Sequence, residues 1–591
     1  MLVYGDAPRR ETVSEKLDRI RGFIADAQTA EPWIVAHGLL VAALVEAGEL
    51  AQGVADRAFE AAGQRDGPAA DGSAGMALTH ALAIAAGLSW REGLIRTEGL
   101  AAATARVERE AADGPLTIKL PEGFAHYGLY PETYWEVARA LAGRDLRVIG
   151  LRSIGTTLSA MVAAGAGAPC PITVRPVGHP FGRTLALARP LPIPPGSEVA
   201  IVDEGPGLSG SSVAGAGAAV LETGGLEAER LHVFPSHANG PGAQATEAVR
   251  RFWSAVRIHL RSFDDAILAA PAPRGLASWV ADLTGEPLGA LREISGGAWR
   301  YSRDWPHGLL PPVHPWQEKR KFLLETSSGT WLLKFAGIGR IGLAKYERAV
   351  ALAEAGLAPA PLGFRHGFMI ERWHGDAKPL DPHGPERPRF LAHLGRYLGF
   401  RARSFPAQPD QGASGKQLFE MLRCNVEEEF GTGRSKDLEG WPAELAARDG
   451  DGLRVETDNR LHAWEWLVLP DGTILKADAL DHHAGHDLIG CQDITWDIAG
   501  AAVEFTLSPD EHRDVIGAVE RVSGLAVDRA KMRFATLCYT AFQLGYYREA
   551  AASSTTAPDE FARLRAAADR YASFLSVLLA VGKGSNAPPG D

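Results

Sequence analysis

The first part of the chain repeats apolar residues at helical spacing. The segments "SEKLDRIRGFIADA" and "PWIVAHGLLVAALVEAGELAQGVADRAFEAA" place apolar residues three and four positions apart, with charges between them. Such spacing gathers the apolar side chains on one face of a helix. The segment "GQRDGPAADGSAG" separates two of these helices. We therefore predict a helical N-terminal region over residues 1–115 that serves as an accessory or docking layer.

From about residue 116 the pattern changes to strands that alternate with helices. "LTIKL", "LRVIGL", "PITVRPV", "SEVAIV" and "AERLHVF" are rich in β-branched and apolar residues, and helical segments lie between several of them. This alternation predicts a parallel, two-sided α/β sheet, and continuous apolar strands such as "VAIV" fit burial on both faces. We expect this α/β domain to occupy residues 116–275.

A third pattern begins after the connection "LAAPAPRGLASW". "KFLLETSSGTWLLKF" predicts a hairpin closed by a Ser-Ser-Gly turn, "AKYERAVALAEAGL" a helix and "GFMIERW" a strand. The remainder is mostly helical, interrupted by the hairpin "HAWEWLVLPDGTILKADAL". A chain of 591 residues is too long for one core, and we place a third domain at residues 285–585.

Charge and composition narrow the function classes. The net charge of −11 argues against a nucleic-acid groove, which requires a basic face. The four cysteines form no CxxC pair, so neither a disulfide framework nor a thiolate zinc site is indicated. The sequence has no stretch of eighteen uncharged apolar residues, so it does not predict a membrane span. We expect a cytoplasmic protein that binds small molecules, and the oligomeric state stays open, a homo-oligomer included.

The segment "VAIVDEGPGLSGSS" is the most informative part of the α/β domain. An apolar strand ends in Asp203 and Glu204 and enters a loop of Gly, Pro and Ser that leads into a helix. Glycines let backbone N–H groups point inward, serine hydroxyls donate hydrogen bonds, and a helix N-terminus carries partial positive charge. Acids at the strand end suit ribose hydroxyls or a magnesium ion on a pyrophosphate. The segment therefore predicts an anion-binding loop.

These residues resemble the type I phosphoribosyltransferases, whose signature is an apolar strand, two acids and a loop ending in Thr-Gly-x-Thr/Ser. The loop here is one residue longer than the family pattern. "VIGLRSIGTT" lies where the family has its pyrophosphate loop, and "RPVGHPFGR" where it has a hood hairpin. The resemblance implies catalytic roles for Asp203 and Glu204, with magnesium and phosphoribosyl pyrophosphate as metal and substrate. The substrate-binding residues it implies are Arg152, Ser153, Gly155, Thr156, Arg175, Ser209, Gly210, Ser211 and Ser212.

Two other interpretations of this loop stay open. A strand, glycine loop and helix can belong to a doubly wound domain that binds a different nucleotide, and the domain can bind its ligand without transferring anything. A Walker loop is excluded because no GxxxxGK[ST] is present, and a GxSxG elbow because Ser209 is followed by Gly210-Ser211.

Residues from about 290 to 580 resemble the aminoglycoside phosphotransferase and choline kinase group, which implies a bilobal α+β kinase-like domain that uses ATP and Mg²⁺. "WLLKFAG" places Lys334 on a strand as the phosphate-pairing lysine, and Glu347 lies in the next helix, where the resemblance implies an ion pair with it. "GFMIERWHG", with Glu371, resembles the hinge strand that receives adenine. "CQDITWDIAGA" resembles a further family stretch, with Asp493 and Asp497 at its acidic positions.

The catalytic segment departs from this family. The family has His-Gly-Asp, with Asn five residues after the Asp, whereas the alignment places Arg460 at the base and Glu465 at the asparagine. Asp478 still matches the metal-binding acid, so Glu465 and Asp478 are the expected magnesium ligands. Asp458 is an alternative base if the loop runs differently. Active phosphotransfer, a nucleotide-binding pseudokinase and another transfer such as nucleotidylation all stay open.

A histidine-rich segment, "LDHHAGHDLIGC", follows Asp478. Its Asp, His and Cys residues could form a transition-metal site, although polar loops are usual at this point of the kinase-like family. Its candidate ligands are Asp481, His482, His483, His486, Asp487 and Cys491.

The sequence thus predicts a bifunctional enzyme of nucleoside or sugar-phosphate metabolism. The middle domain would carry out magnesium-dependent phosphoribosyl transfer, or its reverse, and the C-terminal domain ATP-dependent phosphotransfer to a small molecule. The alternative is a nucleotide-sensing regulatory protein with a pseudokinase domain. The acceptors and the pathway are not fixed by these patterns.

Overall fold

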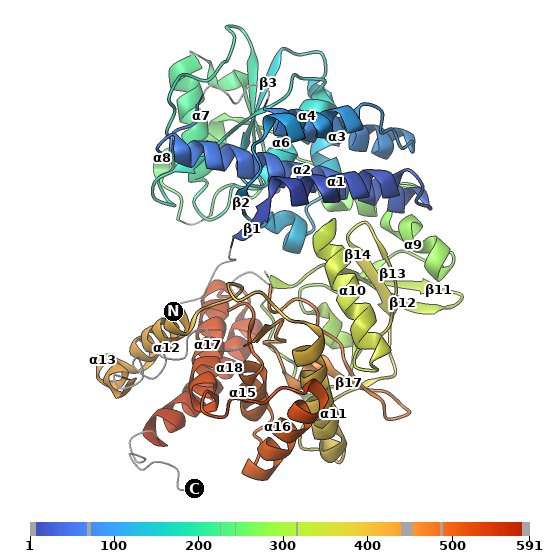
Figure 1. Ribbon diagram of the computed structural model, residues 1–591, viewed down its shortest axis with the longest axis vertical. Coiled ribbons are helices and arrows are strands. Elements are labelled where there is room, and N and C mark those ends of the chain that lie inside the picture. Colours follow the sequence, from blue (N-terminus) through green and yellow to red (C-terminus); the bar gives the residue numbers. More distant parts are fainter. Residues whose placement is uncertain are drawn as a thin grey trace.

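The computed structural model describes residues 8–67, 73–224, 226–242, 244–314, 317–438, 453–484 and 489–581. It is a mixed α/β structure with three regions along its long axis (Figure 1). N-terminal helices and a parallel sheet form one end, an antiparallel sheet lies in the middle, and mostly helical segments form the other end. The fold therefore contains the predicted parallel sheet together with helical regions.

The N-terminal region is helical as predicted. Its helices are α1 (Val13–Ala27), α2 (Trp33–Ala61), α3 (Ala74–Glu92) and α4 (Leu100–Glu110). Thr12 begins α1 with a capping box, in which its hydroxyl accepts from the Glu15 N–H and the Glu15 carboxylate accepts from the Thr12 N–H. A short strand before α1, β1 (Arg9–Thr12), pairs antiparallel with β2 (Pro115–Ile118) and ties the start of the chain to residues beyond α4.

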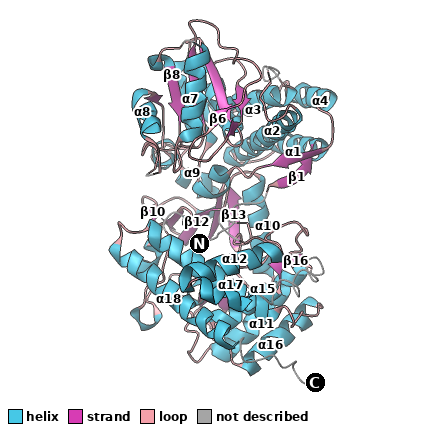
Figure 2. Ribbon diagram, turned by 90° about the vertical axis from the view of Figure 1, so that its left-hand side faces the viewer, coloured by secondary structure: helices cyan, strands magenta, loops and turns pink. Residues whose placement is uncertain are grey.

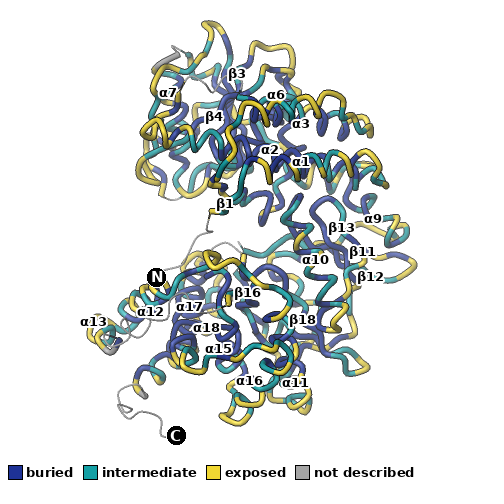
Figure 3. Tube along the Cα trace, viewed as in Figure 1, coloured by how far each residue is buried: buried dark blue, intermediate teal, exposed yellow. Residues whose placement is uncertain are grey.

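Helix α2 is buried without interruption from Leu40 to Gly53 (Figure 3). Among the described residues it is the one helix long and apolar enough to cross a membrane, yet 83% of its most apolar window is buried inside the protein. It packs against α1, α3 and α6 (Gly155–Ala166). Its apolar composition is explained by this central position in the core.

The parallel sheet has five strands in the order β4-β3-β7-β8-β9. They are β3 (Leu146–Leu151), β4 (Ile172–Val174), β7 (Glu198–Val202), β8 (Leu231–Phe234) and β9 (Arg257–Ile258). Helix α6 packs on β3 and β7, and α5 (Pro131–Ala138) packs on α6. Helices α7 (Ser211–Gly224) and α8 (Glu247–Ala255) lie beside β8 (Figure 2). A small hairpin of β5 (Pro176–Val177) and β6 (Thr184–Leu185) lies in the predicted hood segment. A π-helical turn, Gly123–Tyr127, precedes α5.

The antiparallel sheet has five strands in the order β10-β11-β12-β14-β13. They are β10 (Arg292–Glu293), β11 (Lys321–Thr326), β12 (Gly329–Phe335), β13 (Pro361–Arg365) and β14 (Phe368–Arg372). β11 and β12 are the predicted hairpin, and their register pairs Thr326 with Gly329 across the turn. Helix α9 (Leu276–Thr284) precedes the sheet, and α10 (Arg340–Glu354) connects β12 to β13.

The C-terminal part is helical with short strands. Its helices are α11 (Arg387–Ser404), α12 (Gly415–Phe430), α13 (Thr432–Ser435), α15 (Thr495–Glu504), α16 (Pro509–Ser523), α17 (Met532–Ser553) and α18 (Pro558–Val581). The predicted hairpin is formed by β17 (Trp466–Val468) and β18 (Ile474–Lys476), with β15 (Lys378–Pro379) at its edge. A second strand pair joins β16 (Arg454–Val455) to β19 (Gln492–Asp493).

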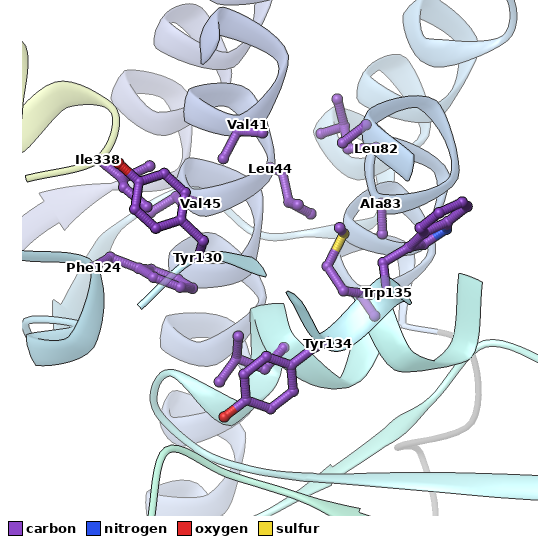
Figure 4. Packing of buried hydrophobic residues seen from close by; sticks show 14 of the residues in the cluster. Val41, Leu44, Val45, Leu82, Ala83, Phe124, Tyr130, Tyr134, Trp135 and Ile338 are labelled. Atoms are coloured by element: carbon purple, nitrogen blue, oxygen red, sulfur yellow. The ribbon is translucent and has the colours of Figure 1, made fainter. Parts of the chain in front are cut away.

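One hydrophobic core runs through the N-terminal helices, the parallel sheet and the antiparallel sheet. Val41, Val45 and Ile338 belong to it, as do Phe124 and Tyr130. In the close view, Val45, Phe124 and Ile338 lie around the Tyr130 ring (Figure 4). The N-terminal helices are thus part of a shared core rather than a separate layer on its surface. The domain boundaries 1–115, 116–275 and 285–585 stay predictions.

Candidate functional site

A cleft lies between the antiparallel sheet and the C-terminal part. It encloses about 1150 Å³ of empty volume, its open mouth included. Sheet residues such as Lys334 and Glu371 line one side, and Arg460, Glu465 and Asp478 line the other. Its aromatic wall consists of Trp299, Trp305, Trp373, Trp464, Tyr546 and Tyr547. Five of the seven site residues predicted for the kinase-like domain therefore line one cavity, and Asp458 and Glu347 do not.

The central contact of the cleft joins Lys334 and Asp478. Lys334 is on β12, and Asp478 follows β18 by two residues. The Lys334 Nζ lies 2.6 Å from the Asp478 Oδ1. Burial alone would raise the pKa of Asp478, but the Lys334 ammonium and His482 hold it well below its usual value. Asp478 is thus kept as an anion that can bind a cation.

The predicted ion pair between Lys334 and Glu347 is wrong. Glu347 is exposed on α10, and Asp478 takes its place beside Lys334. The α10 residue that faces inward is Lys345, which is 5% exposed. Its Nζ lies 2.9 Å from the Asp481 Oδ2. Helix α10 therefore adds a lysine to the site where the resemblance implied a carboxylate.

Three lysines converge on two acids at one end of the cleft. Lys319 pairs with Asp481, as Lys345 does, while Lys334 pairs with Asp478. Burial and the neighbouring Lys334 lower the pKa of Lys319 to about 7, and burial lowers the pKa of Lys345 well below its usual value. Lys319 and Lys334 line a second cavity that adjoins the first and includes Arg460. A lysine-rich cavity suits phosphate oxygens, because their negative charge favours the protonated amines.

Arg460 and Asp458, the two residues considered for the base position, lie in different surroundings. Arg460 lines both cavities, with its guanidinium 4.5 Å from the centre of the Tyr546 ring. Asp458 is 1% exposed, and its carboxylate is held by Tyr397, Lys476 and His482. The side chain of Asp458 is therefore fully engaged beneath the cleft, which gives no support to a role as catalytic base.

Asp497 supports this loop from below. Its carboxylate accepts hydrogen bonds from the Asp458 N–H at 2.7 Å and from the Asn459 N–H at 2.9 Å. Burial raises the pKa of Asp497 to about 6. The loop that presents Arg460 to the cleft is thus fixed by two backbone hydrogen bonds to a buried acid of α15.

The expected magnesium pair is rearranged in the structure. Glu465 accepts a hydrogen bond from the Lys476 Nζ at 2.6 Å, just as Asp478 and Asp481 are paired with other lysines. The groups of three potential ligands that include Asp478 or Glu465 are Asp478-Asp481-His482 and Asp458-Glu465-His482, each with ligand atoms within 4.8 Å of one another. Neither group joins Glu465 to Asp478. Asp478 and Asp481 belong to one of these groups and both line the second cavity, which makes them the candidate oxygen donors for Mg²⁺.

Glu371 lies beside these groups on β14. Burial raises its pKa to about 7, against the opposing influence of Lys334. It was predicted as a nucleotide-binding residue, and the structure places it in the lining of the cleft. Of the predicted histidine cluster, Asp481, His482, His483 and Cys491 are buried, whereas His486 and Asp487 lie outside the described residues. Burial and nearby Glu456 raise the pKa of the Cys491 thiol to about 12, which disfavours metal binding as a thiolate.

The predicted anion loop begins at the carboxyl end of β7 and ends at the N-terminus of α7. Burial raises the pKa of Asp203 to about 6 and that of Glu204 to about 8. The hydroxyls of Ser209 and Ser211 both donate to the Pro180 carbonyl, at 2.8 and 2.7 Å. Two of the predicted phosphate donors are thus directed at the hood hairpin. Gly210 directly precedes α7, and Ser212 is the second residue of that helix.

The two predicted arginines of the α/β domain are engaged by acids from the N-terminal helical region. Arg152 contacts Asp66 at 2.5 Å and Asp56 at 2.9 Å. Arg175 pairs with Asp56 as well, and its backbone N–H donates to Asp66. Ser153, Gly155 and Thr156 lie at the start of α6, directly after Arg152. The geometry gives Arg152 and Arg175 a structural role and no support to phosphate binding by their guanidinium groups.

Several site residues were not predicted from sequence. His126 and Tyr127, from the π-helical turn before α5, line the second cavity. Lys319 lies in a loop without a motif. Lys345 could have been found, because it precedes Ala349 by one helical turn on the buried face of α10.

Comparisons with known proteins give limited similarity. No family model and no curated protein matches the chain, whereas 47 chains of solved structures do. Choline kinase LicA from Streptococcus pneumoniae is 14% identical, with a TM-score of 0.30, over 43% of this chain and 89% of that chain. A choline/ethanolamine kinase family protein from Mesorhizobium loti is 16% identical, with a TM-score of 0.31, over 45% and 90%.

A spectinomycin phosphotransferase in complex with ADP and spectinomycin is 12% identical, with a TM-score of 0.32, over 52% of this chain and 96% of that chain. These neighbours are small-molecule kinases and phosphotransferases, and each match covers about half of the chain. TM-scores at this level do not carry an argument about chemistry, so the interpretation rests on the geometry of the cleft. The comparisons give no support to a phosphoribosyltransferase.

Proposed function

We propose that the cleft binds ATP with magnesium and transfers a phosphoryl group to a small molecule. The observation that carries this proposal is the contact of Lys334 with Asp478 across the cleft, at 2.6 Å. A lysine that pairs with phosphates and an acid that holds the metal are two components that phosphoryl transfer requires. Both are present on opposite walls of one cavity.

The metal would be held by Asp478 and Asp481, whose carboxylate oxygens are the donors that Mg²⁺ prefers. When bound, it would neutralise charge on the nucleotide phosphates. Lys319 and Lys334, which line the second cavity, would bind phosphate oxygens, and the acids they now contact would bind the metal. Arg460 would stabilise negative charge on the transferred group or position the acceptor. A loose transition state requires little proton removal, so the absence of an aspartate at this position is compatible with activity.

The test is ADP release by the purified full chain with ATP and Mg²⁺. A panel of amino sugars, amino alcohols, nucleosides and sugar phosphates covers the acceptor classes. The expected result is ADP release that depends on one acceptor class and is abolished in Asp478→Ala. Stabilisation by ATP without ADP from any acceptor would refute phosphotransfer.

The second candidate is a nucleotide sensor. Arg460 at the base position and the complete engagement of Asp458 favour it. In this case ATP raises the midpoint of thermal unfolding but is not consumed. Thermal shift and ADP release on the same samples separate the two functions.

For the parallel sheet, magnesium-dependent phosphoribosyl transfer or its reverse stays a proposal. Its support is the position of Asp203 and Glu204 at the carboxyl end of β7, where ligands of parallel sheets bind. The double substitution Asp203→Asn with Glu204→Gln should abolish pyrophosphate release from phosphoribosyl pyrophosphate. A wild type that neither binds nor consumes this compound would remove the proposal.

A further inference from the structure

Three buried side chains from distant parts of the sequence meet where the N-terminal helices, the parallel-sheet region and the antiparallel sheet pack together. His37 is on α2, Glu132 is in the first turn of α5, and His366 is in the turn between β13 and β14. The Nε2 atoms of both histidines lie 2.8 Å from the same carboxylate oxygen, Oε1 of Glu132. The side chains of His37 and Glu132 are 0% exposed and that of His366 is 1% exposed.

The surroundings of this cluster are aromatic. Trp33 and Trp90 have ring contacts with His37, and Tyr130 and Trp279 have ring contacts with His366. Tyr130 donates its hydroxyl to the His366 backbone carbonyl at 2.7 Å, which holds the turn in place. A carboxylate in such a dry environment is costly unless a cation balances its charge.

The residues that contact Glu132 do not fully balance the charge of its carboxylate. Among the described residues, its ion-pair contacts are with His37 and His366, and none is with a lysine or arginine. Its second oxygen, Oε2, is buried without a hydrogen-bond partner, and so is the Nδ1 of His366. An unsatisfied carboxylate oxygen in a protein interior costs about 1–3 kcal/mol or more. A bound cation would satisfy Oε2.

The arrangement has the features of a first-row metal site. Two imidazole nitrogens and a carboxylate are a common ligand set for zinc, with bond lengths near 2.0–2.2 Å. Ligands of a tetrahedral ion are roughly 3.3 Å apart at such lengths, so each Nε2 would move about 0.5 Å from its present position. The Nδ1 of His37 lies 3.0 Å from the Ser89 Oγ, the kind of outer hydrogen bond that orients a ligating histidine.

We propose that His37, Glu132 and His366 bind a divalent transition-metal ion, with zinc the best match to the donors. The two Nε2 atoms and one oxygen of the Glu132 carboxylate supply three donors in tetrahedral directions, and the second carboxylate oxygen lies beside the ion. Because each ligand comes from a different structural region, the ion acts as a structural clamp for the whole assembly. The proposal is independent of phosphotransfer, since the site is not part of the cleft.

The experiment measures zinc in the untagged, full-length chain. The protein is equilibrated with ZnCl₂ and desalted, and its zinc content is then measured by inductively coupled plasma mass spectrometry. We expect about one zinc per wild-type chain that is lost in His366→Gln and Glu132→Gln. The matched control is Asp481→Asn, which alters one of the two candidate clusters at the cleft and should retain the zinc. Zinc should also raise the midpoint of thermal unfolding of the wild type but not of His366→Gln.

A second readout does not depend on folded variants. The zinc X-ray absorption spectrum of the wild type should show only nitrogen and oxygen donors, with the scattering pattern of two imidazoles. Three results would overturn the proposal: no retained zinc in the wild type, equal retention in His366→Gln, or loss of zinc in Asp481→Asn.

Discussion

Lys334 and Asp478, 144 positions apart in the sequence, form a hydrogen-bonded ion pair at 2.6 Å across the cleft. The lysine belongs to the antiparallel sheet and the aspartate follows the hairpin of the C-terminal part. The contact therefore forms only when the antiparallel sheet and the C-terminal part are correctly placed relative to each other. We expect substitutions of either residue to change both the stability of the protein and its proposed phosphotransfer.

The first prediction separates these two effects. Lys334→Met should reduce ADP release by roughly 100-fold or more, because an electrostatic contact to the phosphates is lost. It should also destabilise the protein, since Asp478 is left without its partner. The double variant Lys334→Met with Asp478→Asn should recover stability but not activity. Thermal unfolding and ADP release are measured on all three proteins. Recovery of activity in the double variant would contradict the proposed roles.

The second prediction concerns Arg460. Asp478→Ala should eliminate ATP turnover, because the proposed metal ligand is removed. Arg460→Ala should reduce turnover by less than about 10-fold or change the preferred acceptor, since positioning depends more on the metal than on this residue. The measurement is kcat and KM for ATP and acceptor separately. Equal losses in both variants would show that Arg460 is as essential as the metal ligand.

The third prediction uses the raised pKa of Glu204, about 8 compared with an ordinary value of 4.5. Between these values the folded state keeps a proton that the unfolded state has lost, so the free energy of unfolding falls as the pH rises. Glu204→Gln should remove this dependence and be more stable than the wild type above pH 8, by roughly 2–3 kcal/mol after solvent screening. Chemical denaturation at several pH values measures it.

The control for this pH dependence is Glu229→Gln, which changes an exposed glutamate of the same region. Its profile should follow that of the wild type. If Glu204→Gln retains the wild-type slope, the carboxyl is not protonated in the folded protein.

The fourth prediction tests the contact of α2 with α6. A Cβ atom at Gly48 would clash with the Thr157 side chain. Gly48→Ala should therefore destabilise the protein by about 1–3 kcal/mol. The control is Gly22→Ala on α1, where nothing lies within 4 Å of the added carbon, and which should stabilise by about 0.5–1 kcal/mol. Thermal unfolding compares the two. A stable Gly48→Ala would mean that the two helices pack less closely.

Local patterns were sufficient to predict much of this fold. Strands such as β7 and β12 are continuous or alternating apolar runs, and their order gave the parallel sheet and the β11–β12 hairpin. The same pattern contained a signal that was missed, because Lys345 and Ala349 share the buried face of α10 while Glu347 lies about 200° away. The family resemblance favoured Glu347, but the apolar periodicity favoured Lys345.

Contacts between distant segments were beyond sequence reasoning. The ion pairs of Arg152 with Asp56 and Asp66 form only because α2 and the loop after it pack beside the parallel sheet. The meeting of His37, Glu132 and His366 has the same origin. No spacing rule relates residues that are brought together only by tertiary packing.

The shared core also determines which part of the protein can move. Phe263 packs against Phe322 and Phe368, and Tyr130 packs against Phe335, so aromatic rings fix the antiparallel sheet to the parallel-sheet region. A hinge between those two regions would have to expose these rings to water. Closure of the cleft around a nucleotide is therefore expected to come from rotation of the C-terminal helices toward a stationary sheet. In such a movement the C-terminal helices would change position, while the N-terminal helices and both five-stranded sheets would stay in place.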